Sequence, residues 1–405
     1  MLTTPRDEVA FLDLLDPAFR VDSPAVRAAA EASWYAETAL GLAILRYADC
    51  VALLRDRRLR QVGMDHFAMQ GVTAGPVADM WRELILNVEG DHHHRLRQLV
   101  NPAFAPRRVE ALRPRMREIV HELIDRFVDH GECEFMAEFA DHYPPRVMFE
   151  MLGLPEDEHA QFLEWAKDLT LVLGLTVAQD LERIETSLLA LYECVDRHCA
   201  DRQRQPGEDI LSALVAAEQD GDRLTRQELR SMVVVMVIAG QDSTRNQLGL
   251  ALHTFTEYPE QWALLAKRPE FAERAVEEVM RVDSTIPVVW RVAAEDLTYN
   301  GLEIPAGTRL WLLVAAAQTE PATFAAPRFD ITADRSPQLS FGSGMHYCLG
   351  ALLARWEMRE ALPILAARLG PVELAGQPTW RSELAGFTGP LTLPIRFTPQ
   401  GPAVP

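Results

Sequence analysis

The stretch 339–350, LSFGSGMHYCLG, holds the residues whose types and spacing best indicate chemistry. Gly342, Gly344 and Gly350 fall within nine positions, which indicates a backbone that turns sharply or lies close to another group. Cys348 stands just before an expected helix over 351–369, where the helix dipole and free N–H groups favour an anionic sulfur. A thiolate in that place can bind a metal or act as a nucleophile.

Other kinds of site fit this stretch less well. Gly342 and Gly344 could begin a dinucleotide-binding fingerprint, but Tyr347 stands where its third glycine belongs. The attachment motif of c-type haem, Cys-x-x-Cys-His, does not occur. A cysteine-protease nucleophile stays open, because eleven histidines could supply its partner. A buried structural cysteine is the common alternative for a lone thiol, and the surrounding glycines disfavour it.

The loop resembles the haem-ligand loop of the cytochrome P450 family, Phe-Gly-x-Gly-x-His-x-Cys-x-Gly. All six specified positions match: Phe341, Gly342, Gly344, His346, Cys348 and Gly350. The resemblance implies that Cys348 is the axial ligand of the iron of haem b, and that its thiolate donates electron density favouring O–O cleavage. It also implies that Phe341, Gly342, His346 and Gly350 lie against the cofactor.

A long helix is predicted from the capping box at Thr225–Glu228 to about Tyr258, spanning roughly 50 Å at about 1.5 Å per residue. The apolar run 233–239 predicts that its first half is buried. The polar run 240–244, GQDST, then interrupts it, and burying such groups costs stability unless they are hydrogen-bonded. One interpretation is a kink at which Asp242 caps the next segment, and the alternative is oxygen chemistry.

The run 239–243 resembles the family's oxygen-activation motif, Ala-Gly-x-acid-Thr. The resemblance implies that Ala239 and Gly240 lie beside the haem and that Asp242 and Ser243 relay protons to bound oxygen. Ser243 stands where threonine is usual, so the hydroxyl is kept while the methyl group that restricts its rotamer is lost. Thr244 is a further catalytic candidate, although on a helix it cannot point the same way as Ser243.

One other motif lies at family spacing. Glu278 and Arg281, at the end of a predicted helix over 272–281, share a helical face and can pair. An ordinary surface salt bridge is one interpretation, and the resemblance implies a structural ion pair near the proximal side of the haem. The three consecutive histidines His92–His94 could be interpreted as a zinc site. Consecutive residues of a helix point about 100° apart, however, so these side chains cannot bind one metal together.

The resemblance assigns four residues to the haem propionates, which require charge-assisted donors: His93, Arg97, Arg291 and His346. It also places five mostly apolar residues at the substrate pocket: Ile286, Val288, Val289, Phe387 and Thr388. These indicate a mostly hydrophobic organic substrate, such as a secondary metabolite, and the resemblance implies a monooxygenase that hydroxylates it with O2.

The chain has no room for a flavin or iron–sulfur module, so electrons are expected from a separate ferredoxin and ferredoxin reductase. A basic landing patch for the acidic ferredoxin could be formed by Arg107, Arg108, Arg113, Arg115, Arg117, Arg355 and Arg359. Ordinary solvated helix charge is the alternative. Two other functions stay open on this scaffold: oxidative coupling or peroxide-driven oxidation, and a non-catalytic haem sensor or carrier.

The amino-acid composition limits the classes of protein to which the chain can belong. The 405 residues are 48% hydrophobic and 24% charged, which is typical of a soluble protein. A net charge of −19 argues against general nucleic-acid binding. Five cysteines without a Cys-x-x-Cys pair, no signal peptide and no apolar run of about eighteen residues predict a cytoplasmic protein that does not span a membrane.

The predicted fold is mainly α with small β-sheets, as a single domain over 1–405 with flexible ends at 1–20 and 398–405. Helices are expected over 49–56 and 117–128, the latter ended by Gly131, and strands over 42–47 and 391–397. Asn300-Gly301, between 297–299 and 302–304, predicts a hairpin. Residues 57–80 lack periodicity and are expected to form a loop, either a lid or a surface connection.

Overall fold

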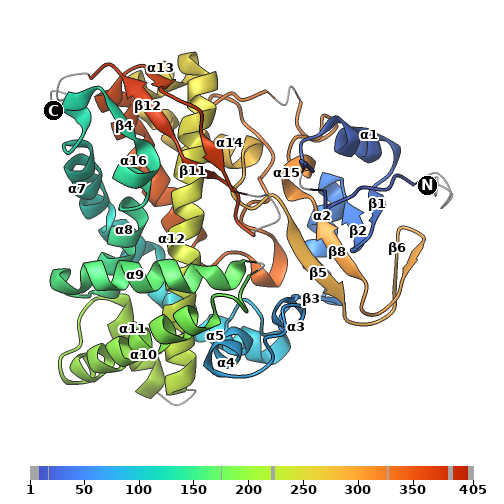
Figure 1. Ribbon diagram of the computed structural model, residues 1–405, viewed down its shortest axis with the longest axis horizontal. Coiled ribbons are helices and arrows are strands. Elements are labelled where there is room, and N and C mark those ends of the chain that lie inside the picture. The colour runs from blue at the N-terminus through green and yellow to red at the C-terminus, as the bar shows by residue number, and fades with distance from the viewer. Residues whose placement is uncertain are drawn as a thin grey trace. The chain divides into compact units, whose positions relative to one another are not determined.

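The computed structural model describes residues 9–16, 18–174, 176–219, 224–325, 328–381 and 386–399 (Figure 1). The chain divides into two compact units. Unit 1 comprises Met1–Val62, Arg274–Cys348 and Trp380–Gly389, and unit 2 comprises Gly63–Glu273, Leu349–Thr379 and Pro390–Pro405. The predicted single domain stays a prediction, and residues 1–8, 17 and 400–405 of the predicted flexible ends lie outside the described residues.

Unit 1 is built on a five-stranded sheet in the order β1-β2-β8-β5-β3. Its strands are β1 (Tyr35–Thr38), β2 (Gly41–Ile44), β3 (Leu59–Arg60), β5 (Val289–Ala293) and β8 (Arg309–Leu312), and only β2 and β8 run parallel. Alternate residues of a strand face opposite sides, so Ile44 and Leu310 enter one hydrophobic cluster while Ala43 and Trp311 enter another. The helices of this unit are α1 (Pro24–Ala32), α2 (Tyr47–Arg55), most of α14 (Ala272–Val282), α15 (Val314–Ala317) and η8 (Gly344–His346).

The predicted hairpin is confirmed as β6 (Leu297–Tyr299) and β7 (Leu302–Ile304). Asn300 and Gly301 take φ values of 47° and 81°, the left-handed conformations that a tight two-residue turn requires. The turn is also held from outside, because Asn300 Nδ2 and the Tyr299 hydroxyl both donate to Asp49 Oδ1, each at 2.9 Å.

Unit 2 is mainly helical. Its α-helices are α3 (Asp65–Ala68), α4 (Pro76–Glu83), α5 (Gly90–Val100), α6 (Pro106–Ala111), α7 (Arg113–Ile124), α8 (Tyr143–Leu152), α9 (His159–Thr170), α10 (Leu181–Arg204), α11 (Ile210–Gln219), α12 (Arg226–Glu257), α13 (Pro259–Lys267) and α16 (Ala351–Leu369). Shorter turns are η2 (Asn101–Phe104), η3 (Val128–His130), η4 (Met136–Ala140), η5 (Glu156–Glu158), η6 (Leu171–Leu173) and η7 (Pro269–Phe271). A three-stranded sheet has the order β4-β12-β9, from β4 (Glu132–Glu134), β12 (Pro394–Phe397) and β9 (Val372–Leu374), and β10 (Thr379–Trp380) and β11 (Pro390–Thr392) complete the strands.

The long helix α12 is the centre of unit 2 and packs against α8, α9, α10, α13 and α16 (Figure 1, yellow). It begins at the predicted capping box: Glu228 N–H donates to Thr225 Oγ1 at 3.1 Å, and Thr225 N–H donates to Glu228 Oε2 at 2.8 Å. The apolar first half is buried, as predicted. The helix is continuous through Ala239–Thr244, so the interpretation in which Asp242 caps a second segment is wrong.

Three local predictions need correction. Residues 57–80 hold β3, α3 and the start of α4 rather than a loop, because Phe67 stacks on Trp81 at 4.8 Å and orders the region. The predicted strand 391–397 is two strands, with Leu393 between them. The predicted helix 117–128 begins earlier and ends at Ile124, after which Gly131 takes the left-handed conformation at φ 70°.

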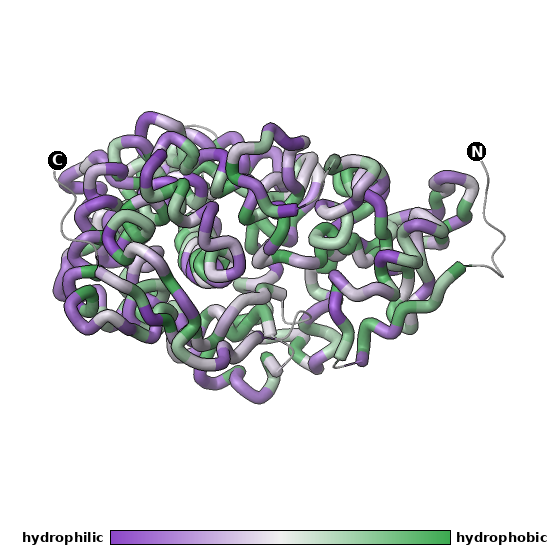
Figure 2. Tube along the Cα trace, turned by 90° about the horizontal axis from the view of Figure 1, so that it is seen from above, coloured by the Kyte–Doolittle hydropathy of each residue, from purple (hydrophilic) through white to green (hydrophobic). Residues whose placement is uncertain are grey.

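The predicted fold class, mainly α with small β-sheets, is confirmed. Along the trace in Figure 2, hydrophobic and hydrophilic residues alternate over short stretches. Accordingly, no helix among the described residues has the length and apolar character that a membrane crossing requires.

Candidate functional site

The Cys348 loop in unit 1 is closed by its own backbone. The Cys348 N–H donates to the Phe341 carbonyl at 3.0 Å, and the Gly342 N–H donates to the Leu339 carbonyl at 2.8 Å. Gly342 and Gly344 take φ values of 70° and 76°, which other residues rarely adopt. Cys348 is exposed at the end of this loop, whereas the other four cysteines are buried.

The loop also lies against the end of α2. A Cβ at Gly344 would come within 2.8 Å of the Leu54 carbonyl oxygen, so a side chain there would push the loop away. Next to it, Arg55 Nε donates to Ser343 Oγ at 2.7 Å. An accessible thiol on a backbone fixed in this way fits a protein ligand for the iron of a haem.

Glu278 and Arg281 form a two-pronged ion pair within α14. Arg281 Nε and Nη2 each donate to Glu278 at 2.8 Å, and the side chains are 1% and 3% exposed for Arg281 and Glu278 respectively. Arg281 Nη1 also donates to the Gln318 carbonyl at 3.0 Å, and Glu278 accepts from the Asp330 N–H at 3.1 Å and from Arg335 Nη2 at 3.4 Å. The pair is therefore deeply buried and joins three segments of unit 1.

The same network reaches the start of the cysteine loop. Ser340 Oγ donates to the Met280 carbonyl at 2.7 Å, and the Leu339 N–H donates to the side-chain oxygen of Gln318. Gln338 Nε2 donates to Glu277 Oε2 at 3.2 Å. The helix that carries the ion pair thus fixes the chain that leads into Cys348.

Other predicted residues of unit 1 lie on β5 and on two neighbouring segments. Arg291 is buried on β5, where Nη1 donates to Gln61 Oε1 at 3.1 Å and to the Trp290 carbonyl at 2.8 Å. The segments of the predicted substrate residues are brought together, because the Thr388 N–H donates to the Thr285 carbonyl at 2.8 Å and Thr285 Oγ1 donates to the Thr388 carbonyl at 2.9 Å. Of these residues Val288 is buried, and Ile286, Val289, Phe387 and Thr388 are half-buried.

Helix α12 in unit 2 carries the predicted oxygen-site residues. Ser243 Oγ donates to the Ala239 carbonyl one turn earlier at 2.6 Å, and Asp242 is buried. Gly240 lies under the Met148 side chain of α8, and a Cβ there would overlap its methyl group. The structure thus records a packing reason for this glycine, on the side that faces α8.

Thr244 points away from Ser243, as predicted, and its partner was not foreseen. Thr244 Oγ1 donates to Glu357 Oε2 on α16 at 3.2 Å, and the Tyr143 hydroxyl donates to the Glu357 backbone carbonyl at 3.0 Å. Burial raises the pKa of Glu357 well above its usual range, and the Thr244 hydrogen bond offsets this only in part. A buried carboxyl group with a raised pKa is therefore hydrogen-bonded to α12 at Thr244, the residue after Ser243.

The sequence carries a signal for Glu357 that lies outside the family motifs. It is spaced four residues from Leu353 and Ala361 on the predicted helix 351–369, and all three are buried. A carboxylate in line with apolar residues on one helical face must be paired or neutral. That pattern could have identified it as a functional candidate.

The three histidines of α5 diverge, in agreement with the argument against one zinc site. His92 Nε2 lies 3.1 Å from Glu228 Oε1, and His94 Nε2 lies 2.8 Å from the Gln98 amide. His93 is buried and Arg97 is half-buried. Of the two remaining predicted cofactor residues, His346 is half-buried in η8, and Gly350 is the N-cap of α16.

Comparison with known proteins decides the family. Residues 73–368 match the family model described as Cytochrome P450. The chain belongs to the cytochrome P450 family. This confirms the resemblance drawn from the sequence motifs.

Individual relatives of this P450 chain are similar over most of its length. Luteothin monooxygenase of Streptomyces thioluteus is 41% identical over 394 residues, 96% of each chain. Mycinamicin IV hydroxylase/epoxidase of Micromonospora griseorubida is 36% identical over 321 residues, 77% of this chain and 79% of that protein. The crystal structure of CalO2 superposes with a TM-score of 0.86 at 30% identity, covering 95% of this chain and all of CalO2.

These findings establish the chemistry in outline. The protein is a cytochrome P450 monooxygenase, which carries haem and oxidises an organic substrate with O2 and electrons from redox partners. The residues described above fit that group, because an exposed thiol on a glycine-held loop and buried basic side chains are the donors that haem iron and propionates need.

Proposed function

We propose that the protein hydroxylates a mostly hydrophobic secondary metabolite at haem b held by the Cys348 thiolate. The observation that carries the ligand assignment is the exposed Cys348 thiol at the end of a loop fixed by Gly342 and Gly344. Haem, when bound, supplies the activation of O2. The protein's own groups hold the cofactor, deliver protons and shape the substrate pocket.

For proton delivery we assign Asp242 and Ser243 as the catalytic pair. The Ser243 hydroxyl donates to the Ala239 carbonyl, so it must break or share that hydrogen bond to pass a proton onward. Thr244 takes a positioning role in this scheme, because its hydroxyl donates to Glu357 and holds a buried carboxyl group against α12. Ala239 and Gly240 would form the part of the helix that faces the cofactor.

For cofactor binding we assign His93, Arg97, Arg291 and His346 to the two propionates. Arg291 is already buried, and a buried cation is stable only when it is paired. Arg291 donates to the Gln61 and Trp290 oxygens, and a propionate would add a charge-assisted hydrogen bond to the same guanidinium group. Phe341, Gly342 and Gly350 would contact the ring.

The substrate class rests on the relatives and on the apolar pocket residues. The relatives are named for luteothin and mycinamicin IV, so compounds related to these natural products are the first to test. Ile286, Val288 and Val289 supply apolar surface, and the Thr285–Thr388 hydrogen bonds fix Phe387 and Thr388 beside them.

The ligand assignment is tested with Cys348→His, compared with Cys199→Ser on α10. Cys348→His should retain some haem and lose the red-shifted ferrous carbonyl band that thiolate ligation produces, whereas Cys199→Ser should keep it. An unchanged carbonyl spectrum in Cys348→His would refute the assignment. Titration of the ferric haem with metabolites related to the compounds named above should then identify the substrate by its spectral shift.

For the redox partner we propose an acidic ferredoxin that docks on the arginine-rich face of α6, α7 and α16. The structure reduces the charge expected there, because Glu360 pairs with Arg113 and Arg117 and Glu273 pairs with Arg359. The same arginines line an open recess of about 350 Å³ beside Trp356. Arg107 on α6 stays exposed and is the first residue to test.

Arg107→Glu should slow electron transfer from a reduced ferredoxin, and the slowing should fade as salt screens the interaction. Arg204→Glu on α10, which alters another exposed arginine, is the matched control. Equal electron-transfer rates in the two variants would show that Arg107 is not part of the docking site.

Two broader expectations stay proposals. We propose a cytoplasmic location, supported by five cysteines that are all free of disulfide bonds. We also propose that the 405 residues act as one functional domain.

A further inference from the structure

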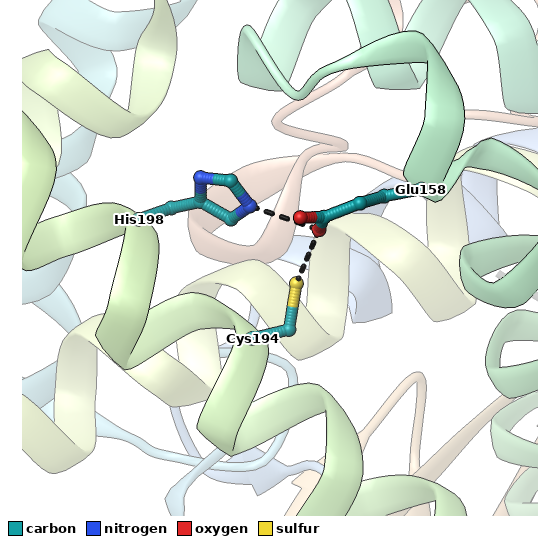
Figure 3. Close-up of side chains that lie close together, drawn as sticks. All are labelled: Glu158, Cys194 and His198. Atoms are coloured by element: carbon teal, nitrogen blue, oxygen red, sulfur yellow. Dashed lines mark hydrogen bonds and ion pairs between the residues drawn. The ribbon is translucent and has the colours of Figure 1, made fainter.

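A group of three potential metal ligands lies in unit 2, on the elements that precede and follow α9 (Figure 3). Cys194 and His198 are four residues apart on α10, so both point from the same face of that helix. Glu158 reaches them from the end of η5. His198 Nε2 lies 2.9 Å from Glu158 Oε2, and the Cys194 thiol donates to the same oxygen at 3.3 Å.

The three ligand atoms converge on one point. All of them lie within 4.8 Å of one another. Ligands around tetrahedral zinc, at about 2.3 Å for sulfur and about 2.0–2.2 Å for nitrogen and oxygen, are separated by roughly 3.3–3.6 Å. Atoms at the 4.8 Å limit would therefore need to approach each other by about 1.2–1.5 Å to close on an ion.

Burial and ligand type favour a specific site over a loose surface cluster. Cys194 and His198 are 2% and 5% exposed, whereas the Glu158 side chain is 26% exposed and leaves a way in from solvent. Sulfur, imidazole and carboxylate are the ligand set of zinc, whereas magnesium and calcium prefer oxygen alone. We propose that Glu158, Cys194 and His198 form a binding site for a thiophilic divalent cation, Zn²⁺ above all, with water as the fourth ligand.

Arg197 is the competitor of the ion. Its Nη2 donates to Glu158 Oε1 at 2.9 Å and lies 3.7 Å from Cys194 Sγ, so without metal it supplies the positive charge beside the carboxylate. Burial, with the hydrogen bond to Glu158, raises the pKa of the Cys194 thiol to about 12. A bound ion must displace the thiol proton to solvent and move the Arg197 side chain, which is 56% exposed and free to swing outward.

The test uses untagged holoenzyme with full haem content. Zinc affinity is measured by competition with a chromophoric chelator, and bound zinc is counted by elemental analysis after gel filtration. One zinc per chain is expected, and Cys194→Ser and His198→Gln should each weaken binding by at least about tenfold to a hundredfold, the effect known for removing even an outer-shell partner. Excess zinc should raise the melting temperature of the wild type by more than that of either variant.

Two variants separate a metal site from a structural cluster. Cys199→Ser, which alters another buried cysteine of α10, should leave the zinc affinity unchanged. Arg197→Gln should tighten zinc binding, because it removes the competing cation, whereas a merely structural role for the cluster predicts no zinc effect at all. X-ray absorption at the zinc edge should show one sulfur at about 2.3 Å, absent in Cys194→Ser.

Three outcomes would overturn the proposal. They are no stoichiometric zinc in the wild type, equal affinities in wild type and Cys194→Ser, or a zinc spectrum without sulfur. Equal affinities with a sulfur-free spectrum would locate the ion at surface histidines instead. None of these readouts depends on catalytic turnover, so the result is independent of the proposed haem chemistry.

Discussion

Removal of either partner of the Glu278–Arg281 pair should destabilise the protein strongly. Breaking a buried ion pair costs about 3–5 kcal/mol, because the remaining charge is left uncompensated. In Arg281→Met, Glu278 keeps the Asp330 N–H and Arg335, so we expect the lower end, about 3 kcal/mol. In Glu278→Leu, Arg281 loses both hydrogen bonds to the carboxylate and keeps the Gln318 carbonyl and the Phe324 ring, so we expect a cost within the same range, about 3–5 kcal/mol.

The assay has two readouts on the holoprotein. The first is the free energy of unfolding from urea midpoints. The second is the fraction of the ferrous carbonyl complex that keeps the thiolate-type band, which should fall because α14 fixes Gln338–Ser340 ahead of Cys348. The double variant Glu278→Leu/Arg281→Met should cost less than the sum of the single variants, because no lone charge stays buried.

The matched control is the Asp79–Arg82 pair of α4. It has the same three-residue spacing, but its side chains are 64% and 47% exposed for Asp79 and Arg82 respectively. Exposed pairs contribute about 0–1 kcal/mol, so Arg82→Met should change stability little. The reasoning is refuted if Arg281→Met costs no more than Arg82→Met, or if the double variant equals the sum of its parts.

Three further outcomes follow from the site. Ser243→Ala should lower the product formed per NAD(P)H oxidised and raise peroxide release at constant haem content, and Ser243→Thr should have the opposite effects. Equal ratios of product to NAD(P)H in wild type and Ser243→Ala would exclude the Ser243 hydroxyl as the proton relay. Arg97→Ala should weaken haem retention by about 1–3 kcal/mol, as one donor to an anion is lost; wild-type retention in mild denaturant would contradict this. Above its usual pKa of 4.5, Glu357 favours folding less as pH rises, because the folded state holds its proton more tightly than the unfolded chain. Glu357→Gln should flatten that decline, and pH profiles of unfolding that run parallel would contradict it.

Structural elements that depend on residues close together in the sequence were predicted from it. The Asn300–Gly301 turn, the Thr225 capping box and the helix 351–369 each depend on residues within a few positions of one another. The same holds for the Cys348 loop, because Gly342 and Gly344 adopt left-handed φ values that few other residues tolerate. Such features need no knowledge of the rest of the fold.

Features that depend on distant partners escaped prediction. Residues 57–80 show no periodicity, yet Trp81 stacks on Phe67 and donates to the Gly63 carbonyl at 2.9 Å, which orders the region through its own tertiary contacts. The arginines of α7 led to the prediction of a basic surface. Two of them are paired with Glu360, which lies more than 240 positions away in the sequence. Charge on one helix cannot be judged before its neighbour is known.

The polar residues at the middle of α12 show which features can be predicted from the sequence and which cannot. Helical geometry alone separates the Ser243 and Thr244 directions, and the structure agrees. What the sequence could not supply is the group that Thr244 meets, because Glu357 is 113 positions away. A threonine bonded to a buried carboxyl group on another helix has a different role from a serine bonded to its own helix, so substitution of the two neighbouring hydroxyls should have different effects. Thr244→Val should therefore alter the pH dependence of stability through Glu357. Ser243→Ala should instead alter the amount of product formed per NAD(P)H oxidised.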